Sequence, residues 1–241
     1  MVSESLWAQH AQWWQEGFTD GADPEYEEQI LPLIEQLLHG AQRVLDVGCG
    51  EGQVSRRIAG TGAEVVGIDP TAAQIRVATE RGGRAQFIRA RSEQIPSPNA
   101  SFDAVVVCLA IEHVDPFEPA IEEVARVLAP GGLFLLILSH PLLQSPGSGW
   151  IDDQISGDYF WTVGPYLPDN LEIDEIAPDV HLQFAHRPLS RYVHEMGQVG
   201  LLIEDMVEPP PPRALLVKTG DIPNAAAIPR LMLLCARRSG Q

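Results

Sequence analysis

Between residues 41 and 140, short runs of valine, isoleucine and leucine alternate with stretches that have helical spacing. Nearly continuous apolar strands separated by helices are typical of a parallel sheet that is covered on both faces. The pattern therefore predicts a doubly wound α/β fold, in which ligands bind beyond the carboxyl ends of the strands. The predicted strands are 43–48, 63–69, 85–88, 102–109 and 133–139, and the predicted helices are about 52–59, 71–81 and 119–128.

Two further segments flank this block. Residues 1–40 look helical and are rich in aromatic side chains. Residues 141–185 show no clear period and hold eight carboxylates without a lysine or arginine, so we expect a structureless lid or binding loop. A helix at about 189–199 and strands near 202–203 and 231–234 complete the sheet. We predict one domain over 1–241, made of an N-terminal helical cap (1–40), a ligand-binding core (41–140), the insert (141–185) and a C-terminal part (186–241).

Composition excludes several classes of function. The chain has 33 acidic and 16 basic residues and a net charge of −17, which disfavours nucleic acid and anionic membranes as partners. Its three cysteines are widely spaced, which indicates a reduced, cytoplasmic protein without a structural metal. The first residues lack the features of a signal peptide, and the longest apolar run, 133–138, is too short to span a bilayer.

A glycine-rich loop, Gly48-Cys49-Gly50-Glu51-Gly52, follows the first strand. The dinucleotide fingerprint requires a glycine at position 53, where this chain has Gln53. Asp46 and Glu51 flank the loop and would repel a pyrophosphate, each by about 4 kcal/mol at 4 Å and an effective dielectric near 20. A positively charged ligand therefore suits the loop better.

Asp69 ends the second strand, 23 residues after Asp46, and this is the spacing of an acid that binds the hydroxyls of a ribose. A nucleoside with a ribose, positive charge and no phosphate describes S-adenosylmethionine (SAM). A plain turn at the glycines and a helix cap at Asp69 remain the structural alternatives.

The sequence resembles the class I SAM-dependent methyltransferases, in particular the small-molecule group with a type 11 methyltransferase domain. The resemblance covers about 41–140 and rests on four motifs, at 44–52, 66–71, 101–105 and 126–132. Residues 186–202 also resemble the helix that commonly follows the family's variable insert. The resemblance implies a Rossmann-like, mostly parallel seven-stranded sheet of order 3-2-1-4-5-7-6, with strand 7 antiparallel, N-terminal helices and an insert after strand five.

The resemblance also implies the residues that hold SAM. The Gly48–Gly50 backbone and Asp46 would surround the methionine moiety, and Asp69 would bind the ribose. After strand three, many relatives have an acid that accepts a hydrogen bond from adenine, where this chain has Arg91. We therefore expect adenine to contact Ser92 or to stack on Arg91. The full set of expected cofactor neighbours is Asp46, Gly48, Cys49, Gly50, Asp69, Pro70, Arg91, Ser92, Glu93 and Leu109.

Methyl transfer from a sulfonium is an in-line displacement, in which the enzyme mainly positions the reactants and excludes water. A hydroxyl acceptor gains from a general base, and a histidine near its natural pKa is the usual one. His113, after strand four, and His140, after strand five, are the candidates, while His186 more simply begins a helix. Structural roles stay open for both candidates. Cys49 is expected to be a small packing residue and Cys108 a core residue.

Aromatic side chains in the two flanking segments are candidates for binding the acceptor, and we select Trp14, Tyr26 and Trp161. The acidic insert would attract a cationic amine or simply face solvent. We predict a SAM-dependent methyltransferase that acts on a small molecule at oxygen and binds no metal. A non-catalytic SAM-binding sensor or partner subunit, and less so an NAD-dependent oxidoreductase, remain alternatives, and monomer and homodimer both stay open.

Overall fold

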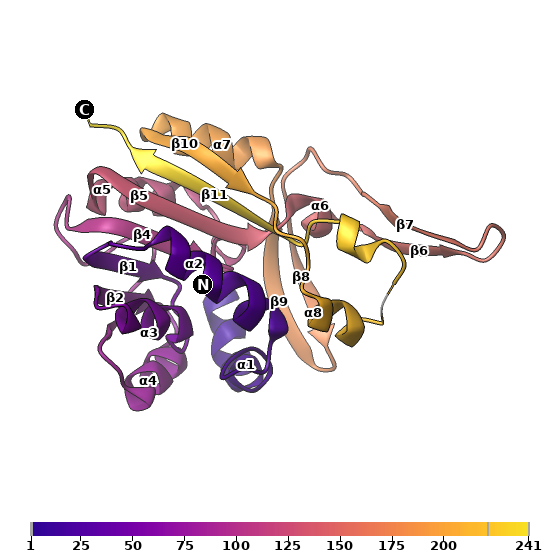
Figure 1. Cartoon of the computed structure of the whole chain (residues 1–241), viewed down its shortest axis with the longest axis horizontal. Coiled ribbons are helices and arrows are strands. Elements are labelled where there is room, and N and C mark those ends of the chain that lie inside the picture. The colour runs from indigo at the N-terminus through magenta and orange to yellow at the C-terminus, as the bar shows by residue number, and fades with distance from the viewer. Residues whose placement is uncertain (1, 221, 241) are drawn as a thin grey trace.

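The computed structural model describes residues 2–220 and 222–240 and contains one seven-stranded sheet. The strand order is β10-β11-β5-β4-β1-β2-β3 (Figure 1). Neighbours among β1 to β5 pair in parallel, whereas β11 is antiparallel to both β5 and β10, so the predicted topology is confirmed. The strands are β1 Arg43–Val47, β2 Glu64–Asp69, β3 Gln86–Arg89, β4 Phe102–Cys108, β5 Leu128–Ser139, β10 Leu201–Val207 and β11 Leu231–Arg238.

Helices cover both faces of the sheet, which explains why its strands are apolar without alternation. On one face, Leu45 and its neighbours pack against α5 (Glu118–Val127) and α7 (Leu189–Gln198). On the other face, Val44 packs against the π-helix η1 (Tyr26–Ile30), α2 (Leu31–Leu37) and α3 (Gln53–Gly60). Successive residues of β1 thus enter opposite halves of the core.

The N-terminal segment is helical as predicted. Helix α1 (Val2–Phe18) packs against α4 (Ala72–Arg81) and against a strand of the insert, β9 (Val180–His186). It thereby lies beside the carboxyl ends of the parallel strands (Figure 1). The short helices η2 (Ile111–His113), α8 (Arg213–Lys218) and η3 (Ala225–Ala227) complete the chain.

The expectation of a structureless insert is wrong. After the short helix α6 (Pro141–Gln144), the chain forms two antiparallel hairpins, β6 (Gly149–Asp153) with β7 (Asp158–Thr162), and β8 (Asn170–Ala177) with β9. Each hairpin pairs its two strands with each other through backbone hydrogen bonds, so both form outside the main sheet and without a strong apolar run. The β8–β9 hairpin packs on α1, whereas β6–β7 projects away from the body (Figure 1).

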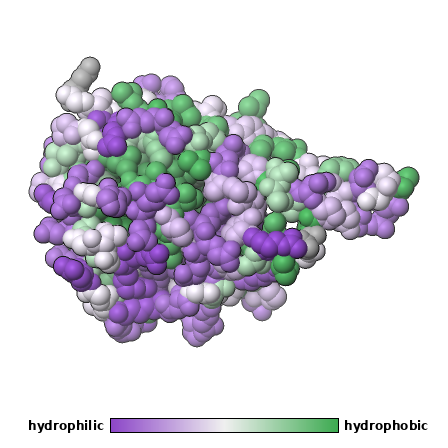
Figure 2. All heavy atoms as spheres, viewed as in Figure 1, coloured by the Kyte–Doolittle hydropathy of each residue, from purple (hydrophilic) through white to green (hydrophobic). Residues whose placement is uncertain are grey.

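The surface mixes hydrophobic and hydrophilic residues, and hydrophobic ones continue along the projecting hairpin (Figure 2). Ile155 at its tip is 99% exposed. Within the described ranges, no helix is long and apolar enough to cross a membrane. The same part of the chain contains no group of three or more histidine, cysteine or acidic side chains arranged to hold a metal ion.

Candidate active site

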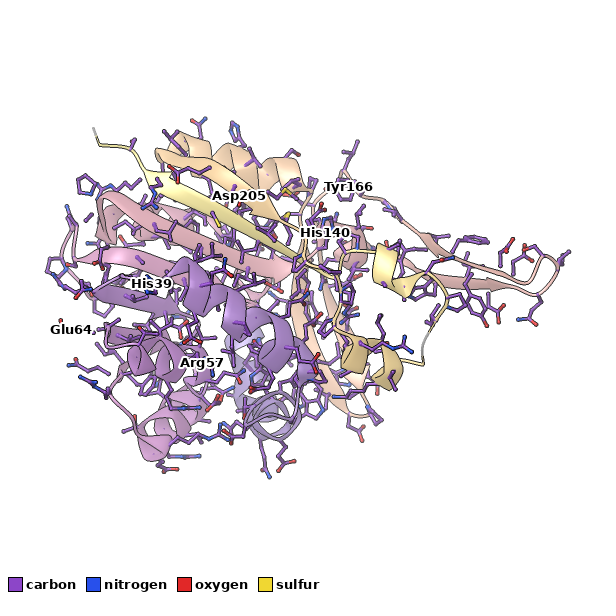
Figure 3. All side chains as sticks on the ribbon, in the orientation of Figure 1. His39, Arg57, Glu64, His140, Tyr166 and Asp205 are labelled. Atoms are coloured by element: carbon purple, nitrogen blue, oxygen red, sulfur yellow. The ribbon has the colours of Figure 1, made fainter. Side chains whose placement is uncertain are left out.

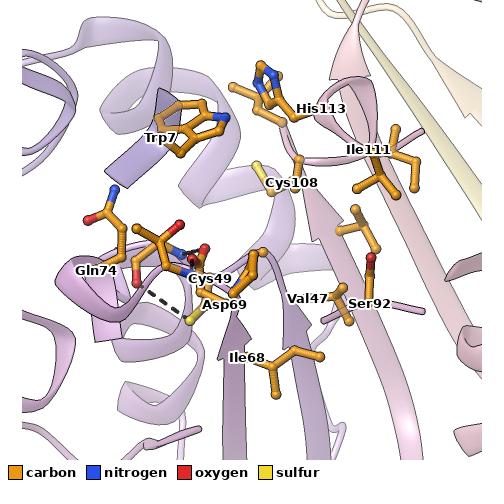
Figure 4. A pocket seen from close by; sticks show the side chains of 18 of the residues that line it. Trp7, Val47, Cys49, Ile68, Asp69, Gln74, Ser92, Cys108, Ile111 and His113 are labelled. Carbon is orange, nitrogen blue, oxygen red and sulfur yellow. Dashed lines mark hydrogen bonds between the residues drawn. The ribbon is translucent and has the colours of Figure 1, made fainter. Parts of the chain in front are cut away.

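A cavity of about 330 Å³ opens at the carboxyl ends of β1, β2, β3 and β4 (Figure 4). Its position agrees with the rule for ligand sites in open α/β sheets. The loops after β1, β2 and β3 line one end, through 46–51, 68–71 and 90–93. The other end is lined by residues that follow β4, by side chains of α1 and η1, and by the β8–β9 hairpin. The residues at this second end are Trp7, Trp14, Tyr26, Cys108, Leu109, Ala110, Ile111, His113, Val114, Asp115, Leu171 and Gln183.

The glycine loop is pulled tightly over the end of β2. The backbone N–H groups of Gly48 and Cys49 both donate to the Ile68 carbonyl, at 2.8 and 2.9 Å. Gly48 has φ +75°, and a Cβ added there would lie 2.4 Å from the Cβ of Ala110. Position 48 therefore requires glycine, because a side chain would push the loop away from the segment that follows β4.

Asp69 has two roles at this end of the cavity. Its Oδ2 accepts a hydrogen bond from Gly50 N at 3.0 Å, and its Oδ1 accepts one from Thr71 N at 2.8 Å, where α4 begins. The carboxylate thus fixes the glycine loop and the start of a helix, and it also lines the cavity. The residue that caps α4 is Thr71, so Asp69 lies two residues before the cap and holds the turn that leads into the helix.

Asp46 and Glu51 differ in their surroundings. Asp46 is buried, and burial raises the pKa of its carboxyl to about 7, although Ser55 Oγ donates a hydrogen bond at 2.6 Å. Glu51 is also buried but pairs with Arg56, whose NH2 lies 2.5 Å from Oε2, and with Arg81. The expectation that both carboxylates repel a phosphate therefore needs correction. The two arginines offset the charge of Glu51, so the repulsion of a phosphate would come from Asp46.

The residues after β3 also reach the cavity. Arg91, Ser92 and Glu93 line it, and Ser92 Oγ donates to Glu93 Oε2 at 2.8 Å. Pro70, Cys49 and Leu109 line it as well, so the structure brings together all ten expected cofactor neighbours.

His113 lies at the far end of the cavity, on η2 (Figure 4). Its Nδ1 is 2.7 Å from the Gln183 carbonyl oxygen, and its ring lies against the rings of Trp7 and Phe184, at 4.9 and 4.7 Å between centroids. Because a carbonyl only accepts, Nδ1 carries the proton and Nε2 holds the lone pair. Burial lowers the pKa of His113 to about 4, below the value near 6.5 that is usual for a histidine acting as a general base.

His140 and Trp161 lie outside this cavity. His140 Nδ1 accepts a hydrogen bond from Leu142 N at 3.1 Å, and Nε2 is 2.8 Å from Glu208 Oε1. It therefore caps α6, at the root of the insert (Figure 3). Trp161, on the projecting hairpin, donates from Nε1 to the Leu142 carbonyl at 3.3 Å and packs edge-on against Trp150. The geometry gives both selected residues structural contacts instead of cavity positions. His186 similarly bonds through Nε2 to the Tyr166 carbonyl at 2.7 Å.

Trp14 and Tyr26 do line the cavity, together with residues that the sequence interpretation missed. Trp7 lies seven residues before Trp14, and this spacing places both side chains on one face of a helix. The spacing was therefore the sequence signal from which Trp7 could have been predicted. Cys108 belongs to the buried core, as expected, and also lines the cavity. Burial raises the pKa of the Cys49 and Cys108 thiols well above the usual value, so both are held as neutral thiols.

Helix α1 covers the glycine-loop end through polar contacts. Gln15 Nε2 donates to Gln74 Oε1 at 2.8 Å, and Gln53 Nε2 donates to the Phe18 carbonyl at 3.3 Å. Where α1 meets β9, His181 N donates to His10 Nε2 at 3.3 Å. These bonds fix α1 so that Trp7 and Trp14 line the cavity.

Comparison with known proteins identifies the domain. Residues 45–136 match the methyltransferase domain family. Demethylmenaquinone methyltransferase of Tropheryma whipplei (strain Twist) is 39% identical over 103 residues, which are 42% of this chain and 43% of that protein. Malonyl-[acyl-carrier protein] O-methyltransferase of Enterobacter lignolyticus is 37% identical over 91 residues, 38% of this chain and 36% of that protein. The chain thus matches about half or less of the length of these curated relatives.

A solved structure extends the likeness beyond the core. The S-adenosylmethionine-dependent methyltransferase of Mesorhizobium loti is 26% identical, with a TM-score of 0.75 over 86% of this chain and 96% of that one. Together with the fold and the glycine loop, these matches show that the chain carries a class I SAM-dependent methyltransferase domain.

The residues of the cavity fit SAM. Asp46 is a buried carboxyl whose ionised form is disfavoured until a cation approaches it, and SAM carries an ammonium and a sulfonium. Asp69 supplies a carboxylate at the end of β2, where a ribose is held in this class of fold. The glycines at 48 and 50 keep the loop between them free of two side chains.

Proposed function

We propose that the chain transfers the methyl group of SAM to an oxygen atom of a small molecule. The observation that carries the proposal is that one cavity joins the Asp46–Gly50 loop and Asp69 to His113 and the tryptophans of α1. A cofactor end and an acceptor end thus share one space, as a transfer between two bound molecules requires. One of the named relatives is an O-methyltransferase, which supports oxygen as the acceptor atom.

When bound, SAM supplies a methyl carbon on a positively charged sulfur, and the electron pair of the broken carbon–sulfur bond stays on that sulfur. The Gly48–Gly50 backbone and Asp46 would hold its amino-acid part, and Asp69 would accept hydrogen bonds from its ribose. His113 Nε2 accepts a hydrogen bond from the acceptor hydroxyl and orients its oxygen. As the oxygen gains the methyl group it loses its proton, which passes by way of Nε2 to solvent.

Replacement of Asp69 by alanine is expected to weaken SAM binding about 5- to 150-fold, or about 1–3 kcal/mol, because hydrogen bonds to a charged acceptor are lost. Calorimetry on protein freed of ligand measures this. Asp103→Ala is the matched control, since Asp103 also accepts hydrogen bonds from two backbone N–H groups, those of Gln42 and Arg43, at the amino ends of β1 and β4. Equal SAM affinity in Asp69→Ala and the natural protein would remove Asp69 from the ribose site.

The low pKa of His113 predicts how pH acts on a variant. His113→Phe keeps a flat ring between Trp7 and Phe184 but removes Nε2, and we expect about a 10²-fold loss of kcat/KM. Because His113 is already neutral well below pH 6, the ratio of natural to variant kcat/KM should stay constant from pH 6 to 9. A ratio that rises through pH 6–7 would show a histidine that titrates near its natural value and contradict this role.

A non-catalytic SAM-binding role is the second candidate, and the weakness of His113 as a base favours it. In that case the purified chain would bind SAM but release no demethylated product with any acceptor. Tight SAM binding combined with methyl transfer to a hydroxyl compound excludes it.

A further inference from the structure

The two ends of the cavity differ in charge. Carboxylates of Asp46, Glu51 and Asp69 lie at the cofactor end together with Glu93, and Asp115 lies at the acceptor end. Among the described residues that line the cavity, Arg91 is the basic one, and it belongs to the cofactor end. Among the described lining residues, the acceptor end therefore offers an anion no lysine or arginine, and the cation nearest to its reacting atom would be the sulfonium of SAM.

Arg187 lies close to the acceptor end but is committed to the protein. It is buried and donates hydrogen bonds to the Val114 carbonyl at 2.6 Å and to Asp115 Oδ1 at 3.0 Å. Its guanidinium also lies over the ring of Phe117, 4.5 Å from the centroid. The arginine therefore offsets Asp115 and fixes the segment after β4, and it does not face a ligand as a second cation in the cavity.

The walls of the acceptor end are aromatic and apolar. Trp7 packs edge-on against Trp14, at 5.3 Å between ring centroids, and against His113 at 4.9 Å. His113 Nε2 is an acceptor without a bonded partner among the described side chains, since Nδ1–H is used by the Gln183 carbonyl. A neutral acceptor nitrogen recognises a hydroxyl that still carries its proton, and it gives nothing to a carboxylate, which has no hydrogen to donate.

An apolar strip continues from the cavity to the surface. Leu171, on β8, lines the cavity and is also 50% exposed. Ile173 lies two residues further along the strand, hence on the same face and about 7 Å away, and is 53% exposed. The hairpin uses other residues to pack on the body, such as Leu182, which is 1% exposed. Leu171 and Ile173 therefore form an apolar path out of the acceptor end.

We propose, on the basis of the function proposed above, that the acceptor is an uncharged hydroxyl compound with an apolar substituent. Its reacting hydroxyl donates to His113 Nε2, its ring or chain lies against Trp7, and the substituent leaves the cavity over Leu171 and Ile173. Carboxylic acids are disfavoured as acceptors, because at neutral pH they have no hydrogen to donate to His113 Nε2 and meet no lysine or arginine among the described residues that line the acceptor end.

The test compares ligands that share one shape. Protein saturated with S-adenosylhomocysteine, the demethylated product, is titrated calorimetrically with 4-pentylphenol, 4-pentylbenzoic acid and phenol at pH 7.5. We expect 4-pentylphenol to bind at least 30-fold more tightly than the acid and at least 10-fold more tightly than phenol. Equal binding of the phenol and the acid, tighter binding of the acid, or binding of neither overturns the proposed class.

A pair of variants tests the strip. Ile173→Asp is expected to reduce the affinity for 4-pentylphenol to that for phenol, and to leave the affinities for phenol and for S-adenosylhomocysteine unchanged. Ile151→Asp is the matched control, since Ile151 is similarly exposed, at 42%, on the projecting hairpin. Equal effects of the two substitutions on 4-pentylphenol binding overturn the strip as a binding surface.

The same titrations separate this inference from the function on which it rests. If S-adenosylhomocysteine and SAM do not bind at all, the proposed function falls and the inference falls with it. If they bind and the acid is preferred or methylated, the proposed function stands and the inference on the acceptor is overturned.

Discussion

Asp46→Asn is expected to weaken SAM binding roughly 30- to 1000-fold at pH 7.5. The substitution keeps the size of the side chain and an oxygen that accepts the hydrogen bond from Ser55 Oγ, but removes the negative charge. Two charges about 4 Å apart at an effective dielectric near 20 attract by about 4 kcal/mol, and a hydrogen bond to a charged group contributes about 1.5–3 kcal/mol. We therefore expect a loss of about 2–4 kcal/mol, to be measured by calorimetry.

The pH dependence distinguishes a lost charge from a damaged loop. Burial raises the pKa of Asp46 to about 7, so the carboxyl must lose a proton before it binds a cation well. The affinity of the natural protein for SAM should therefore fall by up to tenfold per pH unit as pH decreases from 7 to 5, whereas Asp46→Asn should lose none of its remaining affinity over this range. Parallel pH profiles for the two proteins would contradict the assignment.

Stability should change in the opposite sense. The unfolded chain loses the Asp46 proton near pH 4 and the folded chain near pH 7, so between these values the folded state binds more protons and stability falls as pH rises. A shift of about three pKa units corresponds to on the order of 4 kcal/mol. Relative to Asp46→Asn, the ligand-free natural protein should lose about 3–4 kcal/mol of unfolding free energy between pH 4.5 and 8.

The comparison between the two proteins isolates Asp46 from the other buried groups. Burial also raises the pKa of Glu112 to about 7 and lowers that of His113 to about 4, and these groups act in opposite directions with pH. Both groups are present in the natural protein and in Asp46→Asn, so their effects cancel in the difference between urea unfolding curves recorded at each pH. If the unfolding free energies of the two proteins change equally with pH, burial does not raise the pKa of Asp46.

The cofactor end could be predicted from the sequence because its geometry is local. Residues 41–60 contain a strand, a glycine turn and a helix in direct succession. Parallel pairing of β1 with β2 then brings Asp69 next to Gly50. Every expected cofactor neighbour lies at the carboxyl end of a strand or within a few residues of it. In such a fold that position alone places a side chain at the cavity.

The acceptor end depends on contacts that the sequence does not encode locally. His113 and His140 both follow strands, but β5 lies one strand further from β1 than β4 does, so only His113 reaches the cavity. The insert forms two hairpins, and of these β8–β9 contributes residues to the cavity. Trp161 belongs to the other hairpin, β6–β7, which projects from the body. Strand β8 could have been predicted from the alternation of apolar and acidic residues in Leu171-Glu172-Ile173-Asp174. Its apolar residues are about half exposed, however, whereas those of a core strand are buried.

Gly48→Ala is expected to destabilise the protein by roughly 2–5 kcal/mol and to abolish measurable SAM binding. The added Cβ would lie 2.4 Å from the Cβ of Ala110, a contact that neither backbone can relieve without movement. Overpacking of this kind costs about 1–3 kcal/mol, and the left-handed backbone, at φ +75°, costs a non-glycine residue about 1–2 kcal/mol more. Thermal or urea unfolding gives the first effect and calorimetry the second.

Two controls separate the steric contact from the backbone conformation. Gly50→Ala also has positive φ, at +53°, but its Cβ would meet its nearest neighbour, Gln74 Nε2, at 3.9 Å, so we expect a loss of only about 1–2 kcal/mol. The double variant Gly48→Ala/Ala110→Gly removes the opposing methyl group and should recover about 1–3 kcal/mol of the loss. If Gly48→Ala and Gly50→Ala are equally stable, or if Ala110→Gly gives no recovery, then the glycine at 48 serves backbone conformation alone. In that case, the absence of a side chain at position 48 would not be what allows the loop after β1 to approach the segment after β4, where the cofactor end meets the acceptor end.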